Sequence, residues 1–312
     1  MSSGEEPIEQ SPARGERLRR SVLFVPGDHP RRIEKAPSTG ADTLVLDLED
    51  AVAPDAKDRA RELVAAALRE GWAGDAEAAV RINAPGTPQF AADLEAVVIS
   101  GADAIMLPKA QGAEVLAEVS ARIDELESER GPGAPVGLLA LVETPTGVAR
   151  LASLADAAGR VDALCFGHAD FAREMGLEEA DASGGVIFHA RCALAIAARA
   201  AGVPAVDCVF LDVRDEGAFR DDAARGMRLG FEGKLCIHPT QVRIANEVYT
   251  PTAERVDYAR RVVESWDRAL ADGSGVFSLD GRMIDAPLAA LERRVLERAR
   301  RAGALQEAGE PK

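Results

Sequence analysis

The chain contains eight short runs of apolar and β-branched residues, separated by longer stretches of mixed polarity. Within each run the apolar residues follow one another instead of alternating with polar ones, which is typical of parallel strands covered on both faces. The runs therefore predict buried strands. They cover residues 21–26, 43–48, 79–83, 104–109, 136–143, 163–167, 204–210 and 234–239.

Amphipathic patterns occupy the stretches between these runs. Residues 54–70 place one apolar stripe at helical spacing, and Pro54 suits the first turn of that helix. Residues 93–100, 113–126 and 217–229 show a similar pattern. Strands that alternate with helices in this way predict an α/β fold, a (β/α)8 TIM barrel, although a doubly wound open sheet would show the same alternation.

The pattern changes after the eighth run. We expect the barrel to span residues 19–245 and residues 246–304 to form a C-terminal helical extension that is too small to hold a core of its own. Its first helix is expected to begin at Pro251 and its second near Pro287, with a break at Asp272–Gly275. The expected apolar faces are Val256, Ala259, Val263, Trp266 and Leu270 on the first helix, and Leu288, Leu291, Val295 and Leu296 on the second.

Composition and charge exclude several classes of function. The chain carries 37 Lys and Arg against 52 Asp and Glu, a net charge of −15, which disfavours generic nucleic-acid binding. No apolar run approaches the roughly 20 residues of a membrane helix, and the N-terminal residues lack an apolar signal-peptide core. We therefore expect a cytoplasmic protein with no nucleic-acid or membrane partner, and disordered tails at residues 1–18 and 305–312.

Charged residues and histidines follow the C-terminal ends of the predicted strands. In a barrel of parallel strands these ends meet at one mouth, where functional groups gather. Independent apolar strands would rarely all end in such residues by chance. The residues are Asp28 and His29, Asp47, Glu49 and Asp50, Arg81 and Asn83, Lys109, Glu143, His168 and Asp170, and His238.

Glu143 and Asp170 follow neighbouring predicted strands, so their carboxylates are expected to converge. Two carboxylates without His or Cys partners form a hard oxygen site, which Mg2+ occupies while keeping waters and substrate oxygens. The alternative is that each side chain caps a following helix, Glu143 before residues 144–146 and Asp170 before residues 171–175.

Arg81 lies in an apolar strand, where an unpaired guanidinium would be costly. It either forms a buried ion pair with Asp47 or Glu49, or grips a substrate carboxylate, which its bidentate geometry suits. The glycines of residues 131–137 precede a strand instead of following one, so they do not form a dinucleotide-binding fingerprint.

Eight short motifs occur in a fixed order over most of the chain. They are Arg20–Gly27, Asp47–Val52, Val80–Asn83, Met106–Lys109, Leu141–Thr144, Gly167–Phe171, Cys236–Gln241 and Met283–Pro287. Through these motifs the chain resembles the citrate lyase beta subunit-like family of CoA-ester lyases, within the HpcH-HpaI aldolase superfamily. The family often has leucine after the aspartate of the sixth motif, where this chain has Phe171, but the aspartate itself is kept as Asp170.

The resemblance implies a homo-oligomeric barrel, a trimer or hexamer, that binds Mg2+. It also implies cleavage or formation of the Cα–Cβ bond of a 3-hydroxyacyl-CoA of the citryl, malyl or citramalyl type, with an acyl-CoA and a 2-oxo acid as products. By motif, Glu143 and Asp170 match metal ligands, and Arg81 matches a catalytic arginine that holds the substrate acid. Asp285 matches a catalytic carboxylate that the C-terminal extension delivers into a neighbouring subunit's site.

Further expectations concern residues around that centre. Arg20 and Lys109 are expected near the CoA or the substrate. Glu49 and Asp50 are expected to bind near the substrate, where they orient water on the metal or pair with Arg81. Three other activities stay open: a hydroxyacyl-CoA thioesterase on the same site, an aldolase of free 2-oxo acids, and a subunit that depends on an acyl-carrier partner.

Overall fold

Eight parallel strands form a closed barrel in the computed structural model, which describes residues 17–156, 159–179 and 181–305. Each strand pairs with the next along the chain, and the last pairs with the first. The predicted (β/α)8 barrel is confirmed, and the open sheet is excluded. The strands are β1 (Ser21–Pro26), β2 (Thr43–Asp47), β3 (Glu77–Arg81), β4 (Ala104–Leu107), β5 (Gly137–Val142), β6 (Val161–Phe166), β7 (Ala205–Asp207) and β8 (Gly233–Cys236).

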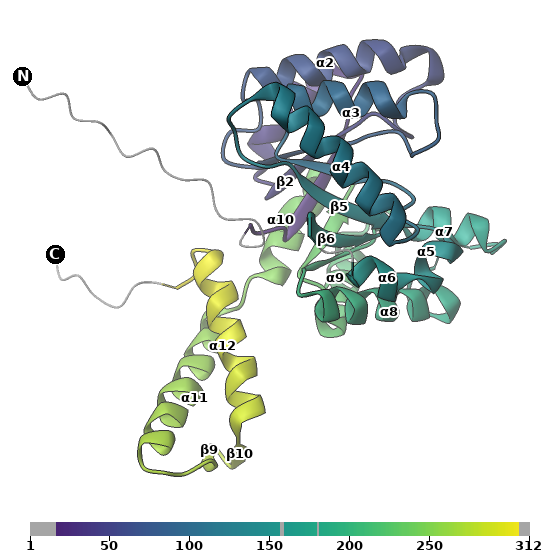
Figure 1. Cartoon of the computed structure of the whole chain (residues 1–312). Helices are drawn as coiled ribbons and strands as arrows, with labels where there is room; N and C mark the ends of the chain where they lie inside the picture. Colours follow the sequence, from purple (N-terminus) through teal and green to yellow (C-terminus); the bar gives the residue numbers. More distant parts are fainter. Residues whose placement is uncertain (1–16, 157–158, 180, 306–312) are drawn as a thin grey trace, which may run out of the picture.

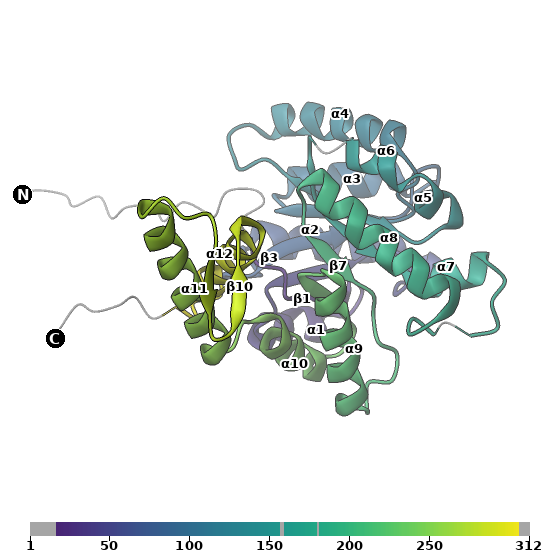
Figure 2. The same ribbon diagram turned by 90° about the horizontal axis from the view of Figure 1, so that it is seen from below.

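Helices surround the strands and cover their outward faces (Figure 1, and from below in Figure 2). The four helical patterns of the sequence are all present, and Pro54 begins a short 3-10 helix directly before the first of them. The helices are α1 (Pro30–Lys35), α2 (Lys57–Arg69), α3 (Phe90–Ile99), α4 (Ala113–Arg130), α5 (Pro145–Ala149), α6 (Leu151–Asp156), α7 (His168–Glu174), α8 (Gly185–Ala201), α9 (Glu216–Leu229) and α10 (Pro239–Tyr249), with the 3-10 helices η1 (Ala36–Thr39) and η2 (Pro54–Ala56).

The inward faces of the strands fill the barrel with apolar side chains and end in charged ones. Val45 and Ala79 are buried in this inner core. Because alternate residues of a strand point to the same side, Asp47 and Arg81 point inward one step nearer the mouth. Asp47 and Arg81 are also register partners in the pairing of β2 with β3. β3 begins and ends two residues earlier than predicted, so Asn83 lies in the following loop.

A helical hairpin follows the barrel. Figure 1 shows that it projects from the barrel and carries two short strands at its far end. Val262 and Trp266 from its first helix pack with Ile284 and Ala289 in a small core between the two arms. Its elements are α11 (Ala253–Ala271), β9 (Phe277–Leu279), β10 (Arg282–Ile284) and α12 (Ala286–Arg301).

The apolar faces predicted for the hairpin are partly wrong. Val262 is fully buried in place of the half-buried Val263, and Leu270 is 51% exposed. Leu288 and Leu291 are also exposed. The buried face is set by where the two helices cross, so apolar residues outside that line stay at the surface of the single chain.

The predicted domain limits, 19–245 and 246–304, stay predictions. The last barrel helix, α10, runs to Tyr249, and α11 begins two residues after Pro251. Of the tails predicted at the two termini, residues 1–16 and 306–312 lie outside the described residues. No helix in the described part of the chain has the length and apolar character needed to cross a membrane.

Candidate active site

Arg81 is held rigidly at the mouth of the barrel. Its Nε and Nη2 donate to the two carboxylate oxygens of Asp47, at 2.8 and 2.5 Å. Nη1 lies 3.3 Å from Oε2 of Glu49 and 3.5 Å from Oδ2 of Asp50, and the guanidinium carbon lies 4.9 Å from the centre of the Phe24 ring. The ion-pair alternative for Arg81 is therefore confirmed. Asp47 occupies Nε and Nη2, so Nη1, whose contacts are longer, is the nitrogen that could also bind a ligand.

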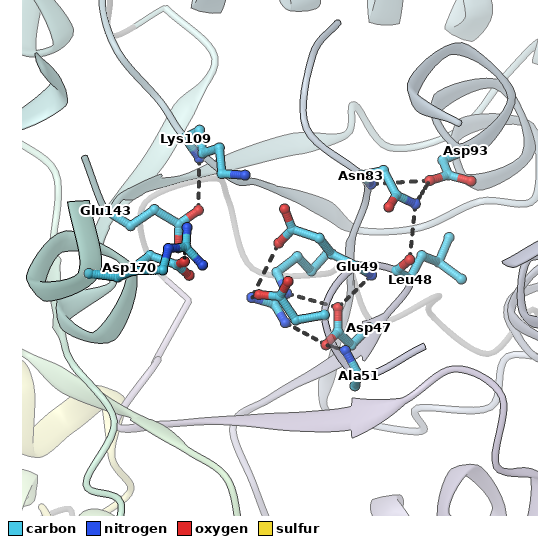
Figure 3. Close-up of polar contacts among 12 residues, drawn as sticks. Asp47, Leu48, Glu49, Ala51, Asn83, Asp93, Lys109, Glu143 and Asp170 are labelled. Atoms are coloured by element: carbon cyan, nitrogen blue, oxygen red, sulfur yellow. Dashed lines mark hydrogen bonds and ion pairs between the residues drawn. The ribbon is translucent and has the colours of Figure 1, made fainter. Parts of the chain in front are cut away.

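Glu143 follows β5 and lies beside Asp170 at the mouth (Figure 3). Its side chain is buried, and Oε1 accepts a hydrogen bond of 3.0 Å from the backbone N–H of Lys109. Lys109 has a φ of 52°, a left-handed conformation that non-glycine residues rarely adopt. Gly167 leaves room for the carboxylate, because a Cβ there would come within 2.5 Å of Cβ and 2.7 Å of Oε2 of Glu143.

Neither of the two acidic residues caps a helix, so that alternative is wrong. Thr144 caps α5 by accepting a hydrogen bond from the backbone N–H of Gly147. Asp170 lies inside the first turn of α7, whose N-cap position belongs to Gly167. Its Oδ1 lies 2.5 Å from Nη2 of Arg173, and 19% of the Asp170 side chain is exposed.

The carboxylates at the mouth repel one another. Burial raises the pKa of Glu143 to about 8, and the negative charges of Glu49 and Asp170 add to this shift. Burial also raises the pKa of Glu49 to about 7, against the lowering effect of Arg81. These shifts show that the protein alone does not balance the charge of the cluster.

This donor set fits a hard divalent cation such as Mg2+. Glu143 and Asp170 supply carboxylate oxygens, and among the described residues no group of three or more His, Cys, Asp or Glu side chains forms a complete metal cage. Mg2+ is commonly bound by one or two carboxylates, with water and substrate oxygens in the other positions. A cation between the two carboxylates would also remove the repulsion that raises the pKa of Glu143.

Two residues that the sequence did not single out fix the loop after β2. Lys57 Nζ donates to the backbone oxygens of Leu48 and Glu49, at 2.7 and 2.5 Å, and to Oδ1 of Asn83 at 2.9 Å. Asp93 accepts from the side-chain amide of Asn83 at 2.6 Å. In the sequence, Lys57 and Asp93 are ordinary polar positions of amphipathic helices, so no local signal marks them.

Three other residues of the sequence analysis lie outside this cluster. The expectation that Arg20 approaches the substrate is wrong, because Arg20 precedes β1 at the end of the barrel opposite the mouth and its guanidinium binds Asp42 at 2.7 and 2.8 Å. Asp285 follows β10 in the hairpin and caps α12, accepting from the backbone N–H of Leu288 at 3.2 Å. His238 caps α10 through Nδ1.

A cavity of about 420 Å³ lies to one side of the mouth, between α7 and α9. Its wall includes His168, a residue that is 3% exposed. Burial and then the charge of Lys234 lower the pKa of His168 to about 4, so its imidazole is neutral. The cavity wall carries more acidic than basic side chains, and Arg225 is the basic one among its described residues. Its acidic residues are Asp181, Asp212, Asp221 and Asp222.

The family described as HpcH/HpaI aldolase/citrate lyase matches residues 20–239, from the start of the barrel to the beginning of α10. The chain belongs to this family. The matched residues include Asp47, Glu49, Arg81, Glu143 and Asp170 at the mouth of the barrel. They leave out the hairpin, and with it Asp285.

Relatives of the family match most of the chain. Citrate lyase subunit beta of Escherichia coli (strain K12) is 40% identical over 293 residues, which cover 93% of this chain and 96% of the relative. L-malyl-CoA/beta-methylmalyl-CoA lyase of Rhodobacter capsulatus is 35% identical over 86% of this chain and 91% of its own length. The crystal structure of CitE from Mycobacterium tuberculosis in complex with magnesium, acetoacetate and coenzyme A has a TM-score of 0.75 and 31% identity, covering 91% of this chain and 99% of that one.

Proposed function

We propose that the chain is a Mg2+-dependent carbon–carbon lyase. It cleaves the Cα–Cβ bond of a 3-hydroxyacyl-CoA thioester to give an acyl-CoA and a 2-oxo acid, or forms that bond in the reverse reaction. The observation that carries the proposal is the pair of carboxylates, Glu143 and Asp170, together with the rigid guanidinium of Arg81, whose charge acts on Glu143. Homology to a citrate lyase subunit and to a malyl-CoA lyase supports a citryl, malyl or citramalyl thioester as substrate.

Glu143 and Asp170 are the residues that would hold Mg2+. The chemistry that Mg2+ would supply is stabilisation of negative charge on the hydroxyl and carboxylate oxygens of the substrate. Both ligands must be ionised, so Glu143 has to lose its proton first. Arg81 would hold the carboxylate of the 2-oxo acid through Nη1, while Asp47 keeps the other edge of the guanidinium in place.

Cleavage requires two proton movements. The 3-hydroxyl gives up its proton, the oxygen electrons form the C=O of the 2-oxo acid, and the electron pair of the broken bond stays on Cα as a thioester enolate. Glu49 would take the hydroxyl proton, because its pKa is about 7 and its buried Oε2 makes no hydrogen bond within the described residues, only the 3.3 Å ion pair with Arg81. Asp285 would donate a proton to Cα and complete the acyl-CoA. Asp50 and Lys109 stay predicted substrate contacts at the rim.

Asp285 would act in the site of a neighbouring subunit. In the single chain it follows β10, which lies at the end of the hairpin away from the barrel (Figure 1). The hairpin also exposes several large apolar side chains, which is typical of a surface that another protein covers. We therefore propose a homo-oligomer, a trimer or hexamer. The exposed residues are Leu270, Val276, Met283, Leu288 and Leu291, between 40% and 70% exposed.

Complementation between two inactive variants tests this arrangement. Glu143→Ala removes a metal ligand and Asp285→Asn removes the proton donor, so each variant alone should lack turnover. Co-expressed chains with different tags form mixed oligomers. If barrel and hairpin of one site come from different subunits, some mixed sites contain both intact residues, and activity should return. Mixed oligomers without activity would contradict the assignment of Asp285 to a neighbour's site.

Product analysis tests the reaction itself. The purified chain and Mg2+ are incubated with malyl-, citramalyl- and citryl-CoA, and the products are identified by mass spectrometry. Acetyl-CoA together with a 2-oxo acid supports the lyase. Free CoA with the intact hydroxy acid would instead identify a thioesterase. Turnover that requires an acyl-carrier protein would identify a carrier-dependent subunit.

A further inference from the structure

The loop that carries Glu49 is held by a lysine from the following helix. Lys57 is the first residue of α2, and its side chain is half-buried against the loop after β2. Its Nζ donates to the backbone oxygens of Leu48 and Glu49, at 2.7 and 2.5 Å, and to Oδ1 of Asn83 at 2.9 Å. An ammonium group has three N–H donors, so Lys57 uses all of them at this place.

The position of Lys57 is unfavourable for its own helix. The positive end of the helix dipole lies at the N-terminus of α2, where it disfavours a cation. No carboxylate within the described part of the chain forms an ion pair with Lys57, and its three acceptors are neutral oxygens. The contribution of this cation therefore lies in the groups that it holds, the carbonyls of Leu48 and Glu49.

A network of hydrogen bonds fixes this loop against α2 and α3. Nδ2 of Asn83 donates to the backbone oxygen of Leu48 at 2.9 Å and to Oδ2 of Asp93 at 2.6 Å (Figure 3). Asp93 is 1% exposed, and its Oδ1 accepts from Nε of Arg61 at 2.7 Å. Arg61 lies one turn after Lys57 on α2, so the contacts form a closed ring that begins and ends on this helix.

The backbone of Glu49 is consequently fixed on both sides. Its N–H donates to Oδ1 of Asp47 at 2.8 Å, and its C=O accepts from Lys57. The same carboxylate of Asp47 holds Arg81. The Glu49 side chain is buried and places Oε2 3.3 Å from Nη1 of Arg81. Movement of the carbonyls that Lys57 holds would therefore displace the Glu49 carboxylate relative to Arg81.

We propose that Lys57 is a positioning residue for Glu49, because its ammonium group keeps the Glu49 carboxylate where it takes the proton of the substrate hydroxyl. This role rests on the proposed lyase function, in which Glu49 is that base. A reacting group that is displaced by about 1 Å can lower the rate by about 100-fold, so the effect is expected in kcat. The hydrogen bonds of Lys57 go to neither Glu143 nor Asp170, so Mg2+ binding should not depend on it.

Chemical rescue in the full-length protein tests this role. For the thioester that the wild type cleaves, Lys57→Ala should lower kcat by about 10- to 100-fold, while KM and the Mg2+ affinity change by less than about threefold. Added propylammonium has the charge and the three donors of the lost group, so it should restore part of the kcat. Lys57→Met lacks the ammonium group but fills the space, so it should lose the same activity without rescue. Tetramethylammonium, which has the charge but no N–H donor, should rescue neither variant.

Hydrogen exchange supplies a measurement that does not use turnover. The amides of Glu49, Ala51 and Val52 donate within this loop, and they should exchange faster in Lys57→Ala than in the wild type. Propylammonium should slow them again. The matched control is Arg59→Ala, which removes an exposed cation of the same helix and should leave both kcat and exchange unchanged. Circular dichroism checks that the variants are folded.

Three results would overturn the role of Lys57. They are a wild-type kcat in Lys57→Ala, a loss that appears in KM instead of kcat, and loop amides that exchange as in the wild type. Rescue by tetramethylammonium as strong as that by propylammonium would overturn it as well. A wild type without lyase turnover would overturn the proposed function, whereas an active wild type beside an equally active Lys57→Ala variant would overturn only the role of Lys57.

Discussion

Binding of Mg2+ should depend steeply on pH because the buried Glu143 has to ionise before it can act as a ligand. Its pKa of about 8 lies far above the ordinary value of 4.5. Between pH 8 and pH 6 the ionised fraction falls from about one half to about one hundredth, so the apparent affinity should weaken by about 50-fold. Near pH 6.5, each bound ion should release about one proton.

The same shift has a consequence for stability without metal. The folded state holds the Glu143 proton more tightly than the unfolded chain, whose carboxyl has the ordinary pKa of 4.5. The metal-free protein should therefore lose stability as the pH rises from about 4.5 to about 8. Saturating Mg2+ should reverse this loss above pH 8, because the ion stabilises the ionised carboxylate.

Calorimetry measures both quantities. Titrations with MgCl2 at pH 6, 7 and 8, in buffers of different ionisation enthalpy, give the affinity and the number of protons released. Glu143→Gln should abolish the binding and the proton release together. Glu125→Gln, the same change at an exposed position of α4, should alter neither. An affinity that stays constant from pH 6 to pH 8 without proton release would refute the assignment of Glu143 as a buried ligand.

Three further predictions concern neighbouring features. Gly167→Ala would push a methyl group against Glu143, so it should weaken Mg2+ binding about tenfold and lower the free energy of unfolding by about 1–3 kcal/mol, measured by calorimetry and urea titration. Asp47→Asn leaves the guanidinium of Arg81 without its bidentate carboxylate partner. It should lower the free energy of unfolding, measured by urea titration, by about 3 kcal/mol, and it should also lower kcat/KM. Asp285→Asn should abolish turnover in a product assay but keep Mg2+ binding, with stability unchanged to within about 0.5 kcal/mol, because asparagine caps helices as well as aspartate.

Controls accompany these variants. Gly217→Ala lies at an exposed position of α9, where the new methyl group would make an ordinary contact of 3.5 Å with Oδ1 of Asp215, and should leave Mg2+ binding intact. Asp58→Asn is the control for Asp47→Asn: it changes an aspartate that is 90% exposed, so the free energy of unfolding should change little. Normal metal affinity in Gly167→Ala, or unchanged stability in Asp47→Asn, would contradict the close contacts on which these predictions depend.

Part of the site follows from position along the strands alone. Glu143 comes directly after the apolar run of β5, and Arg81 ends β3, so a barrel must bring both to its mouth. The same rule applied to Arg20 would have placed it at the opposite end, because it precedes its strand. The resemblance to the family implies a place for Arg20 near the substrate, but the fold puts Arg20 at the end of the barrel opposite the mouth.

Other features depend on contacts between distant segments. The sequence limited the partner of Arg81 to Asp47 or Glu49, which lie at the C-terminal end of the same strand. That Asp47 makes the bidentate pair, while Glu49 lies 3.3 Å away, depends on the register of β2 against β3. Likewise, the raised pKa of Glu143 requires Glu49 and Asp170 to converge on one buried point, and no local pattern contains that information.

The sequence by itself determined the eight strands, the helices between them and the residue types at the mouth, because burial on both faces of a strand leaves a local and continuous apolar signal. Only the tertiary structure decided which side chains pair and which faces of the hairpin stay exposed. It also decided that the hairpin projects from the barrel. These features depend on the packing of segments that lie far apart in the chain, and a local pattern does not specify such packing.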